Sequence, residues 1–299
     1  MAATSTVLSE FDHFKPQAVQ DMVVYEYDAP IGPVSAPKMG QPLEFLIPAE
    51  DGLFRDLSNT LVQLKVKLTK DDGTKTAVTD PVAPVNLLFS SLFKSFDVRL
   101  NGATVAHQNA LHAYRAYMET ALTYSESVLK TRGACQGWMK DDAGGHDVIL
   151  MTDDTTNKIE TNKNFMARQK WMAADKTLVL MGRPHADIFD QDLDIPDNVS
   201  IRLTFTPNEN KFVLMAAANA TFKLELTEAR LFVRTKKLSE NARAAHREMC
   251  LENGGYRFPL VKTVMNLHDV KGGLVEVGSL VPSNTLPSRL VLGFVDTAA

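Results

Sequence analysis

Short runs in which apolar and polar residues alternate recur along most of the chain, and they predict β-strands. The clearest run is residues 61–68, where Leu64, Val66 and Leu68 fall on one face and the residues between them are polar. A period of two is typical of a strand with one buried face. The same pattern predicts further strands at residues 43–48, 96–100, 177–183, 199–205, 222–226 and 229–233, with a possible bulge between the last two.

Residues 96–105 predict a tight β-hairpin. The alternation of residues 96–100 ends at Asn101-Gly102, and the return strand begins at Ala103. Asparagine followed by glycine supplies the two positive φ angles that a type I′ turn requires. We therefore expect two antiparallel neighbours joined by a two-residue turn.

A helix is predicted after the hairpin, at about residues 107–130, because the spacing of apolar residues changes to steps of three and four. Arg115 and Glu119 fall mostly outside the resulting stripe. One helix inserted into a chain of strands predicts an all-β fold with a helical insertion, a jelly-roll β-sandwich of Greek-key type. The stripe expected to face the core consists of Leu111, Tyr114, Tyr117, Met118, Ala121, Leu122, Ser125, Val128 and Leu129.

The irregular segments between these patterns suggest the domain boundaries. Residues 1–40 are interrupted by proline and glycine and predict an N-terminal arm, so the first jelly roll is placed at residues 41–238. Long polar loops are expected at residues 71–84 and 131–170. Residues 239–255 predict a linker helix capped by Ser239, and strands resume over residues 256–299, which are too few to complete a second sandwich.

Charge and cysteine content limit the classes of function. The chain has 299 residues, a net charge of −4 and an isoelectric point near 6.0, whereas a protein that wraps nucleic acid is expected to be basic. Two cysteines do not make a disulfide framework. No secretion signal and no apolar run of membrane-spanning length are visible, and the sequons at Asn198 and Asn219 carry little weight without secretion. We expect synthesis in the cytoplasm or nucleus of a host cell.

Pairs of potential metal ligands are present, but each has a simpler explanation. His246 and Cys250 are four residues apart and could share a helix face, yet a surface histidine beside a half-buried cysteine is the favoured interpretation. His107 and His112 lack the close His-x-His spacing of a cupin-type metal site. Three acidic doublets in predicted loops could bind calcium, although ordinary turn chemistry is favoured: Asp71-Asp72, Asp141-Asp142 and Asp153-Asp154.

Candidate catalytic residues are equally weak. Cys135 lies near Trp138 without a local histidine, which indicates packing and not a nucleophile. Tyr114, Tyr117 and Tyr124 could bind a ligand, but their helical spacing favours core packing or a subunit contact. Phosphate-binding, dinucleotide and nucleophile-elbow motifs are missing from the sequence. We therefore predict no catalytic, cofactor-binding or metal-binding residues and no enzymatic activity.

Two segments resemble the major capsid proteins of Polinton/Maverick elements and adintoviruses. The first runs from the Asn-Gly turn into residues 113–125, AYRAYMETALTYS, with Trp138 and Asp141-Asp142 following. The second is residues 286–295, LPSRLVLGFV, which is similar to a strand early in the second jelly roll of that family. The resemblance implies a double-jelly-roll subunit, here with most of the second jelly roll missing.

The resemblance also implies the function and the partners. A hexon-like subunit of this family forms trimers that tile into an icosahedral shell, so the expected partners are copies of itself, neighbouring capsomers and minor capsid or penton proteins. It implies location in the virion, no cofactor and no specific nucleic-acid binding. A single-jelly-roll minor capsid or penton protein, a lectin-like ligand-binding module and an enzyme on a jelly-roll scaffold remain as alternatives.

Overall fold

A computed structural model of the chain describes residues 22–108, 110–140, 148–150, 162–217, 221–268 and 287–294. The chain divides into two units, residues 1–261 and residues 262–299, and all strands of the described residues lie in the first. The elements are, in chain order, β1 (Val23–Ile31), β2 (Leu43–Ile47), β3 (Leu53–Lys70), β4 (Val82–Pro84), α1 (Leu88–Ser91), β5 (Phe93–Leu100), β6 (Ala103–Gln108), α2 (His112–Thr123), α3 (Glu126–Val128), the π-helical turn η2 (Leu129–Gly133), α4 (Lys163–Met172), β7 (Thr177–Gly182), the 3₁₀ turn η3 (Asp187–Asp190), β8 (Ile201–Pro207), α5 (Asn210–Val213), β9 (Leu214–Ala216), β10 (Phe222–Leu238) and α6 (Glu240–Glu252).

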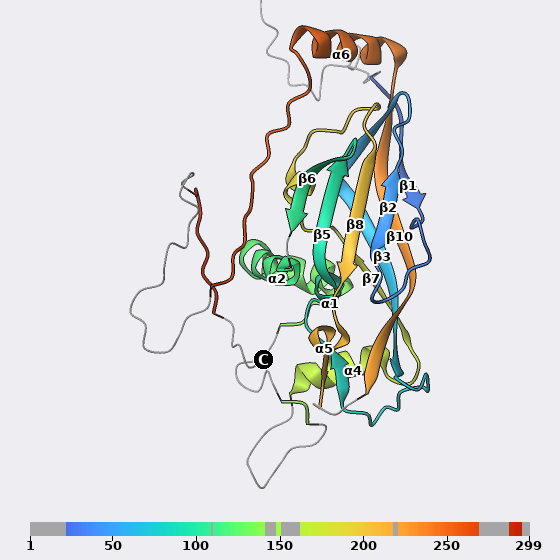
Figure 1. Ribbon diagram of the computed structural model, residues 1–299, viewed down its shortest axis with the longest axis vertical. Helices are drawn as coiled ribbons and strands as arrows, with labels where there is room; N and C mark the ends of the chain where they lie inside the picture. The colour runs from blue at the N-terminus through green and yellow to red at the C-terminus, as the bar shows by residue number, and fades with distance from the viewer. Residues whose placement is uncertain are drawn as a thin grey trace, which may run out of the picture. The chain divides into compact units, whose positions relative to one another are not determined.

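Eight strands of the described residues form two four-stranded antiparallel sheets, with the orders β1-β10-β3-β7 and β2-β8-β5-β6. Counted along the chain, these eight strands read 1-8-3-6 in one sheet and 2-7-4-5 in the other. This nested order of two Greek keys defines a jelly roll. The predicted fold class, an all-β jelly-roll sandwich with helical insertions, is confirmed (Figure 1).

The core lies between the two sheets and is filled by the inward-facing residues of the alternating runs. Aromatic rings dominate the side of β2-β8-β5-β6. The Phe205 ring centroid is 4.2 Å from that of Phe96, 4.9 Å from that of Phe93 and 6.3 Å from that of Phe45. Because each buried ring removes a large apolar area from water, this cluster stabilises the sandwich strongly.

The predicted hairpin is confirmed in detail. β5 and β6 pair across a two-residue turn in which Asn101 has φ of 47° and Gly102 has φ of 83°. The predicted bulge in the last long strand is also confirmed, because the β10–β3 register shifts between Leu226 and Glu228. Local sequence signals therefore set both features.

The helix expected at about 107–130 is shorter than predicted and is broken. β6 continues to Gln108, so α2 begins only at His112. It ends at Thr123 because Tyr124 adopts an extended backbone, with φ of −92° and ψ of 138°. The separate short turns α3 and η2 follow.

Three segments expected to be irregular contain regular structure. β1 lies within the predicted arm and pairs with β10, so the arm prediction is wrong for residues 23–31; residues 1–21 lie outside the described part of the chain. α4 lies within the expected loop 131–170 and is capped by Asn162, whose side chain accepts hydrogen bonds from the amides of Asn164 and Phe165. β4, in the loop 71–84, pairs with β9.

The helices of the first unit lie around the sandwich at different places (Figure 1). α1, α4 and α5 gather near one end of the sheets, with the small β4–β9 sheet, and α2 packs beside β5 and α1. α6 lies at the opposite end and is confirmed as the predicted helix after Ser239, whose hydroxyl accepts a hydrogen bond from the Ala242 amide at 3.4 Å. None of the helices in the described residues is both long and apolar enough to cross a membrane.

Residues 256–268 and 287–294 contain no strand in the described structure. The prediction that strands resume from residue 256 is therefore wrong for residues 256–268 and 287–294, and residues 269–286 and 295–299 lie outside the described part of the chain. A strand is stabilised only by a hydrogen-bonded neighbour. The start of a second jelly roll therefore stays a prediction.

Candidate functional site

The histidines and cysteines considered as metal ligands do not converge. His246 stacks on the Tyr256 ring at 5.0 Å and lies edge-on to Phe54 at 5.3 Å, so it packs α6 against its surroundings. Cys250 is half-buried on the same helix, as expected from the sequence. His107 is exposed on β6 and pairs with the carboxylate of Asp97 on β5. Among the residues that the structure describes, no group of three or more histidine, cysteine or acidic side chains could hold a metal ion.

Of the three acidic doublets considered as calcium ligands, Asp71-Asp72 lies within the described residues and belongs to a turn. The carboxylate of Asp72 accepts hydrogen bonds from the Thr74 hydroxyl at 2.6 Å and from the Thr74 amide at 2.8 Å. These hydrogen bonds hold the pKa of Asp72 below its ordinary value. Turn chemistry therefore accounts for this doublet, and the doublets at residues 141–142 and 153–154 lie outside the described residues.

The aromatic candidates of α2 point to separate neighbours. Tyr114 packs edge-on against Phe212 at 5.7 Å, and Tyr117 packs against Trp138 at 5.3 Å. Tyr124 is exposed, and so is Cys135, which contradicts the expectation that Cys135 is packed. These side chains do not form a common ligand site.

The buried face of α2 is polar, and the sequence analysis missed it. The predicted apolar stripe is largely on the outside, with Leu122 exposed at 67%. The face of α2 opposite to this stripe packs against β5 and α1, and the small side chains of Ala113 and Ala116 allow a close approach. That buried face consists of His112, Ala113, Arg115, Ala116 and Thr120.

Four charged or ionisable side chains form a cluster beneath α2. The Arg115 Nε lies 2.6 Å from the Glu119 carboxylate, and its Nη2 lies 2.6 Å from that of Asp187 at the start of η3. His185 Nδ1 lies 3.0 Å from the second oxygen of Glu119. The arginine side chain is only 6% exposed. Charge-assisted hydrogen bonds therefore join α2 to the segment after β7.

Burial changes the titration of this cluster. Burial alone would raise the pKa of Glu119, but the hydrogen bond from His185 and the charge of Arg115 outweigh it, so that pKa is lowered. The neighbouring His112 is buried against Phe96, and burial, with the charges of His185 and Arg115, lowers its pKa to about 3. His112 is therefore neutral throughout the physiological range.

A second charged cluster holds α6 to the sandwich. Arg243 and Arg247 contact the carboxylate of Asp51 at 2.5 and 2.7 Å, and Arg247 contacts Asp197 at 3.1 Å. No residue of α6 is buried. The ion pairs with Asp51 and Asp197, together with the packing of His246 on Phe54, therefore attach this helix.

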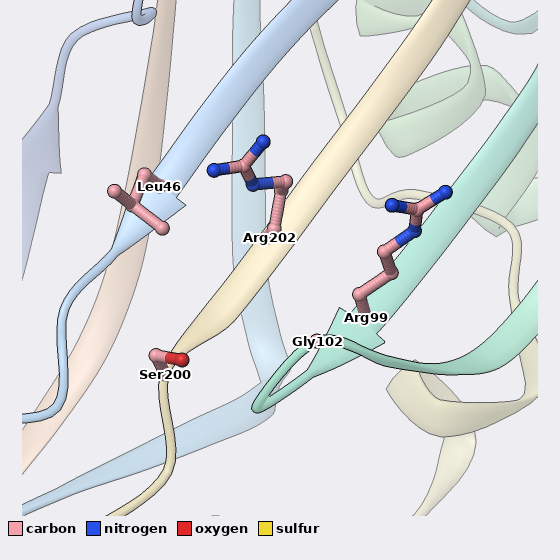
Figure 2. A pocket seen from close by; sticks show the side chains of 5 residues that line it. All are labelled: Leu46, Arg99, Gly102, Ser200 and Arg202. Atoms are coloured by element: carbon pink, nitrogen blue, oxygen red, sulfur yellow. The ribbon is translucent and has the colours of Figure 1, made fainter.

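A small hollow opens on the outer face of the second sheet, beside the β5–β6 turn (Figure 2). Its volume is about 180 Å³. Two arginine side chains rise from neighbouring strands, while a leucine and a serine lie to one side and a glycine of the turn to the other. The lining residues are Leu46, Arg99, Gly102, Ser200 and Arg202.

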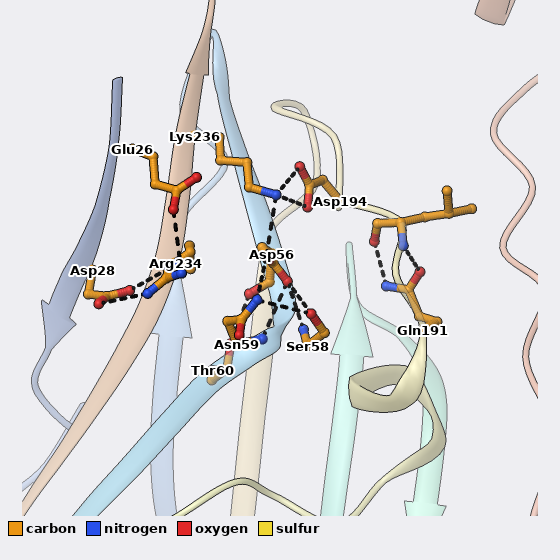
Figure 3. A network of polar contacts seen from close by, with 11 residues as sticks. Glu26, Asp28, Asp56, Ser58, Asn59, Thr60, Gln191, Asp194, Arg234 and Lys236 are labelled. Carbon is orange, nitrogen blue, oxygen red and sulfur yellow. Dashed lines mark hydrogen bonds and ion pairs between the residues drawn. The ribbon is translucent and has the colours of Figure 1, made fainter. Parts of the chain in front are cut away.

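A third polar network fixes an irregular part of β3 (Figure 3). The pairing of β3 with β10 is interrupted at residues 57–60. On either side of this interruption, Asp56 pairs with Arg234 and Leu61 pairs with Phe232. The Asp56 carboxylate accepts hydrogen bonds from the amide and hydroxyl of Ser58 and from the Asn59 side chain. Lys236 bridges Asp56 and Asp194, at 3.4 and 3.0 Å.

β1 is an exposed sheet edge. It pairs with β10 alone among the described strands, and both of its faces carry exposed side chains, including Val24 and Tyr27. A separate set of ion pairs anchors it to β10, because Arg234 of β10 contacts Glu26 and Asp28 of β1 (Figure 3). An exposed edge with apolar side chains is a surface on which another chain can pack.

Comparison with known proteins places the fold. No family model matches the sequence. An uncharacterized protein of Caenorhabditis elegans, F54H12.2, is 23% identical over 276 residues, which are 86% of this chain and 60% of the worm protein. The present chain thus spans less than two thirds of that relative.

Two solved structures are similar in fold. One is a chain of the Sputnik virophage determined by cryo-EM, with a TM-score of 0.51 and 14% identity over 81% of this chain and 53% of that one. The other is the Faustovirus major capsid protein, with a TM-score of 0.50 and 10% identity over 82% of this chain and 59% of that one. Together with the strand order, these similarities show that the chain has the jelly-roll fold found in these virion structures.

Proposed function

We propose that this chain is a capsid protein, a structural subunit of a virion that works by associating with copies of itself. The observation that carries the proposal is the strand order of the two sheets, together with the fold similarity to the Faustovirus major capsid protein. The sequence resemblance to the capsid proteins of Polinton/Maverick elements and adintoviruses supports the same function. A location in the virion follows from it.

The geometry suits a shell subunit. The large aromatic core and the nested strand order make a rigid body, and the edge strand β1 presents exposed apolar side chains. Rigid subunits with several exposed surfaces can close into rings and shells through heterologous contacts. Trimers, neighbouring capsomers and minor capsid or penton proteins are the partners we propose.

The experiment is to purify the full chain and measure its mass by size-exclusion chromatography with light scattering, followed by negative-stain electron microscopy. A trimer, at three times the 33.0 kDa of one chain, is the expected species. A mass that stays at one chain at all concentrations would contradict self-assembly by this chain. Binding of glycans or of a catalytic metal would favour a lectin-like module or an enzyme instead.

We further propose that the described sandwich is the first of two jelly rolls and that residues 256–299 begin the second. Support comes from the matched shares of 53% and 59% of the two solved chains. The resemblance of residues 286–295 to a strand early in the second jelly roll of the Polinton/Maverick capsid proteins agrees with this plan, although residues 287–294 form no strand in the structure. Sequencing the genomic region downstream of the codon for Ala299 tests it: coding sequence for further strands would support a double-jelly-roll protein of the Polinton type, and its lack would favour a single-jelly-roll minor capsid protein.

A further inference from the structure

The hollow beside the β5–β6 turn carries an excess of positive charge on a protein whose net charge is −4. Arg99 on β5 and Arg202 on β8 are direct cross-strand partners, so they share the outer face of the sheet. Figure 2 shows both side chains rising from neighbouring strands beside the hollow. Like charges placed directly opposite each other destabilise a sheet unless something neutralises them.

Protein carboxylates neutralise this pair poorly. Within the described residues, Arg99 has no carboxylate within ion-pair distance, and Arg202 is 3.6 Å from Glu44 in a contact that water reaches on both sides. In contrast, Arg115 contacts two carboxylates at 2.6 Å. The two arginines of the hollow therefore retain most of their capacity to bind an anion.

The hollow is held in shape by contacts that do not involve the arginines. The Asn101 side-chain oxygen accepts hydrogen bonds from the Ser200 amide at 2.8 Å and from the Ser200 hydroxyl at 3.1 Å. The Asn101 amide donates to the Ser200 carbonyl at 2.9 Å. The turn is thus tied to the beginning of β8, and the binding surface exists before a ligand arrives.

We propose that this hollow binds a phosphate-type oxyanion between the guanidinium groups of Arg99 and Arg202. A guanidinium donates two parallel hydrogen bonds to an oxyanion, and two guanidinium groups match the charge of a dianion. The volume of about 180 Å³ is below the range of roughly 300–1,000 Å³ typical of sites for larger organic ligands, which favours a single phosphate group. Bound phosphate would also remove the repulsion between the two arginines.

The test is isothermal titration of the full chain with sodium phosphate at constant ionic strength. Arg99→Gln and Arg202→Gln should each weaken phosphate binding at least about tenfold, because each removes one charge-assisted pair of hydrogen bonds. Arg132→Gln is the matched control, since it removes an exposed arginine of η2 away from this sheet, and it should change the affinity less than about twofold. Thermal unfolding without phosphate verifies that all three variants fold.

The outcomes separate the proposal from nonspecific attraction and identify the source of the phosphate. No binding at millimolar phosphate, or an equal loss in the Arg132→Gln control, would overturn the site. A second titration uses a short single-stranded DNA. Tighter binding of the DNA that requires both arginines assigns the phosphate to a nucleic-acid backbone, whereas equal or weaker binding assigns it to a free phosphate. The site does not depend on capsid assembly, so it can be tested on a protein that stays monomeric.

Discussion

Replacing Arg115 by methionine should destabilise the sandwich more than any exposed charge replacement. Methionine keeps most of the aliphatic length but removes both ion pairs, at 2.6 Å to Glu119 and at 2.6 Å to Asp187. Breaking a buried ion pair by removing one partner costs about 3–5 kcal/mol, because a charge is left buried without compensation. The Glu119 side chain is 30% exposed and can recover some hydration.

The expected cost is therefore about 3 kcal/mol, at the lower end of that range. For a domain of this size, each kilocalorie lowers the melting temperature by about 2–4 °C, so Arg115→Met should melt about 6–12 °C lower than the unmodified chain. Urea unfolding followed by circular dichroism measures the free energy, and a thermal scan measures the melting temperature. Unfolding must be reversible for the first value to be used.

Two further variants make this prediction specific. Lys130→Met removes the basic partner of an exposed ion pair with Glu126 and should change the melting temperature by less than about 1 °C. Adding Glu119→Gln to Arg115→Met should restore part of the lost stability, because one of the two carboxylates that lost the arginine becomes neutral. A loss below about 1 kcal/mol for Arg115→Met, or no recovery in the double variant, would refute the buried-cluster interpretation.

Three more outcomes test the structure. His112 has a folded pKa of about 3, below the unfolded value of about 6.5. Its contribution to the free energy of unfolding is therefore complete above pH 6.5 and decreases as the pH falls toward 3, by up to about 1.4 kcal/mol per pH unit. His112→Gln should flatten this dependence of the unfolding free energy on pH, measured by urea unfolding at a series of pH values. Gly182→Ala places a Cβ 2.9 Å from the buried Phe89 ring and should cost about 1–3 kcal/mol, whereas Gly32→Ala, with open space around it, should cost almost nothing; thermal unfolding of both variants measures this. Arg243→Gln should speed hydrogen exchange in α6 without changing exchange in β3, and salt should have the same effect on the unmodified chain because exposed ion pairs are screened.

The strands were predictable because their signals are local. Alternation identified β3, β8 and β10, and Asn101-Gly102 identified the turn. Which strands pair with each other could not be predicted from such local signals, because pairing joins distant parts of the chain. β1, for example, pairs with β10 across about 200 residues. β1 itself was missed since it carries Pro30 and exposes both faces, so it lacks the alternation of a half-buried strand.

The orientation of α2 could not be read from its own residues. Tyr114, Tyr117 and Leu122 form the more apolar stripe, and hydrophobicity alone places that stripe inward. The structure buries Arg115 instead, because Asp187 from the segment after β7 pairs with Arg115, and His185 from the same segment pairs with Glu119, the other partner of Arg115. Burying a charge is unfavourable without such partners, and the sequence of the helix does not reveal them.

Because they differ in burial, the ion pairs of α6 and the Arg115 cluster beneath α2 should respond in opposite order to salt and to acid. The ion pairs of α6 with Asp51 are in contact with water, so salt weakens them over a Debye length of about 8 Å at physiological ionic strength. The Arg115 cluster lies beneath α2 and is screened much less. Acid should affect α2 before α6. The stabilising effect of His112 on α2 already decreases below pH 6.5. The Asp51 carboxylate that holds α6 stays charged to lower pH, because Arg247 and Arg243 lower its pKa. Salt should therefore release α6 before α2 loosens, and mild acid should loosen α2 while α6 remains attached.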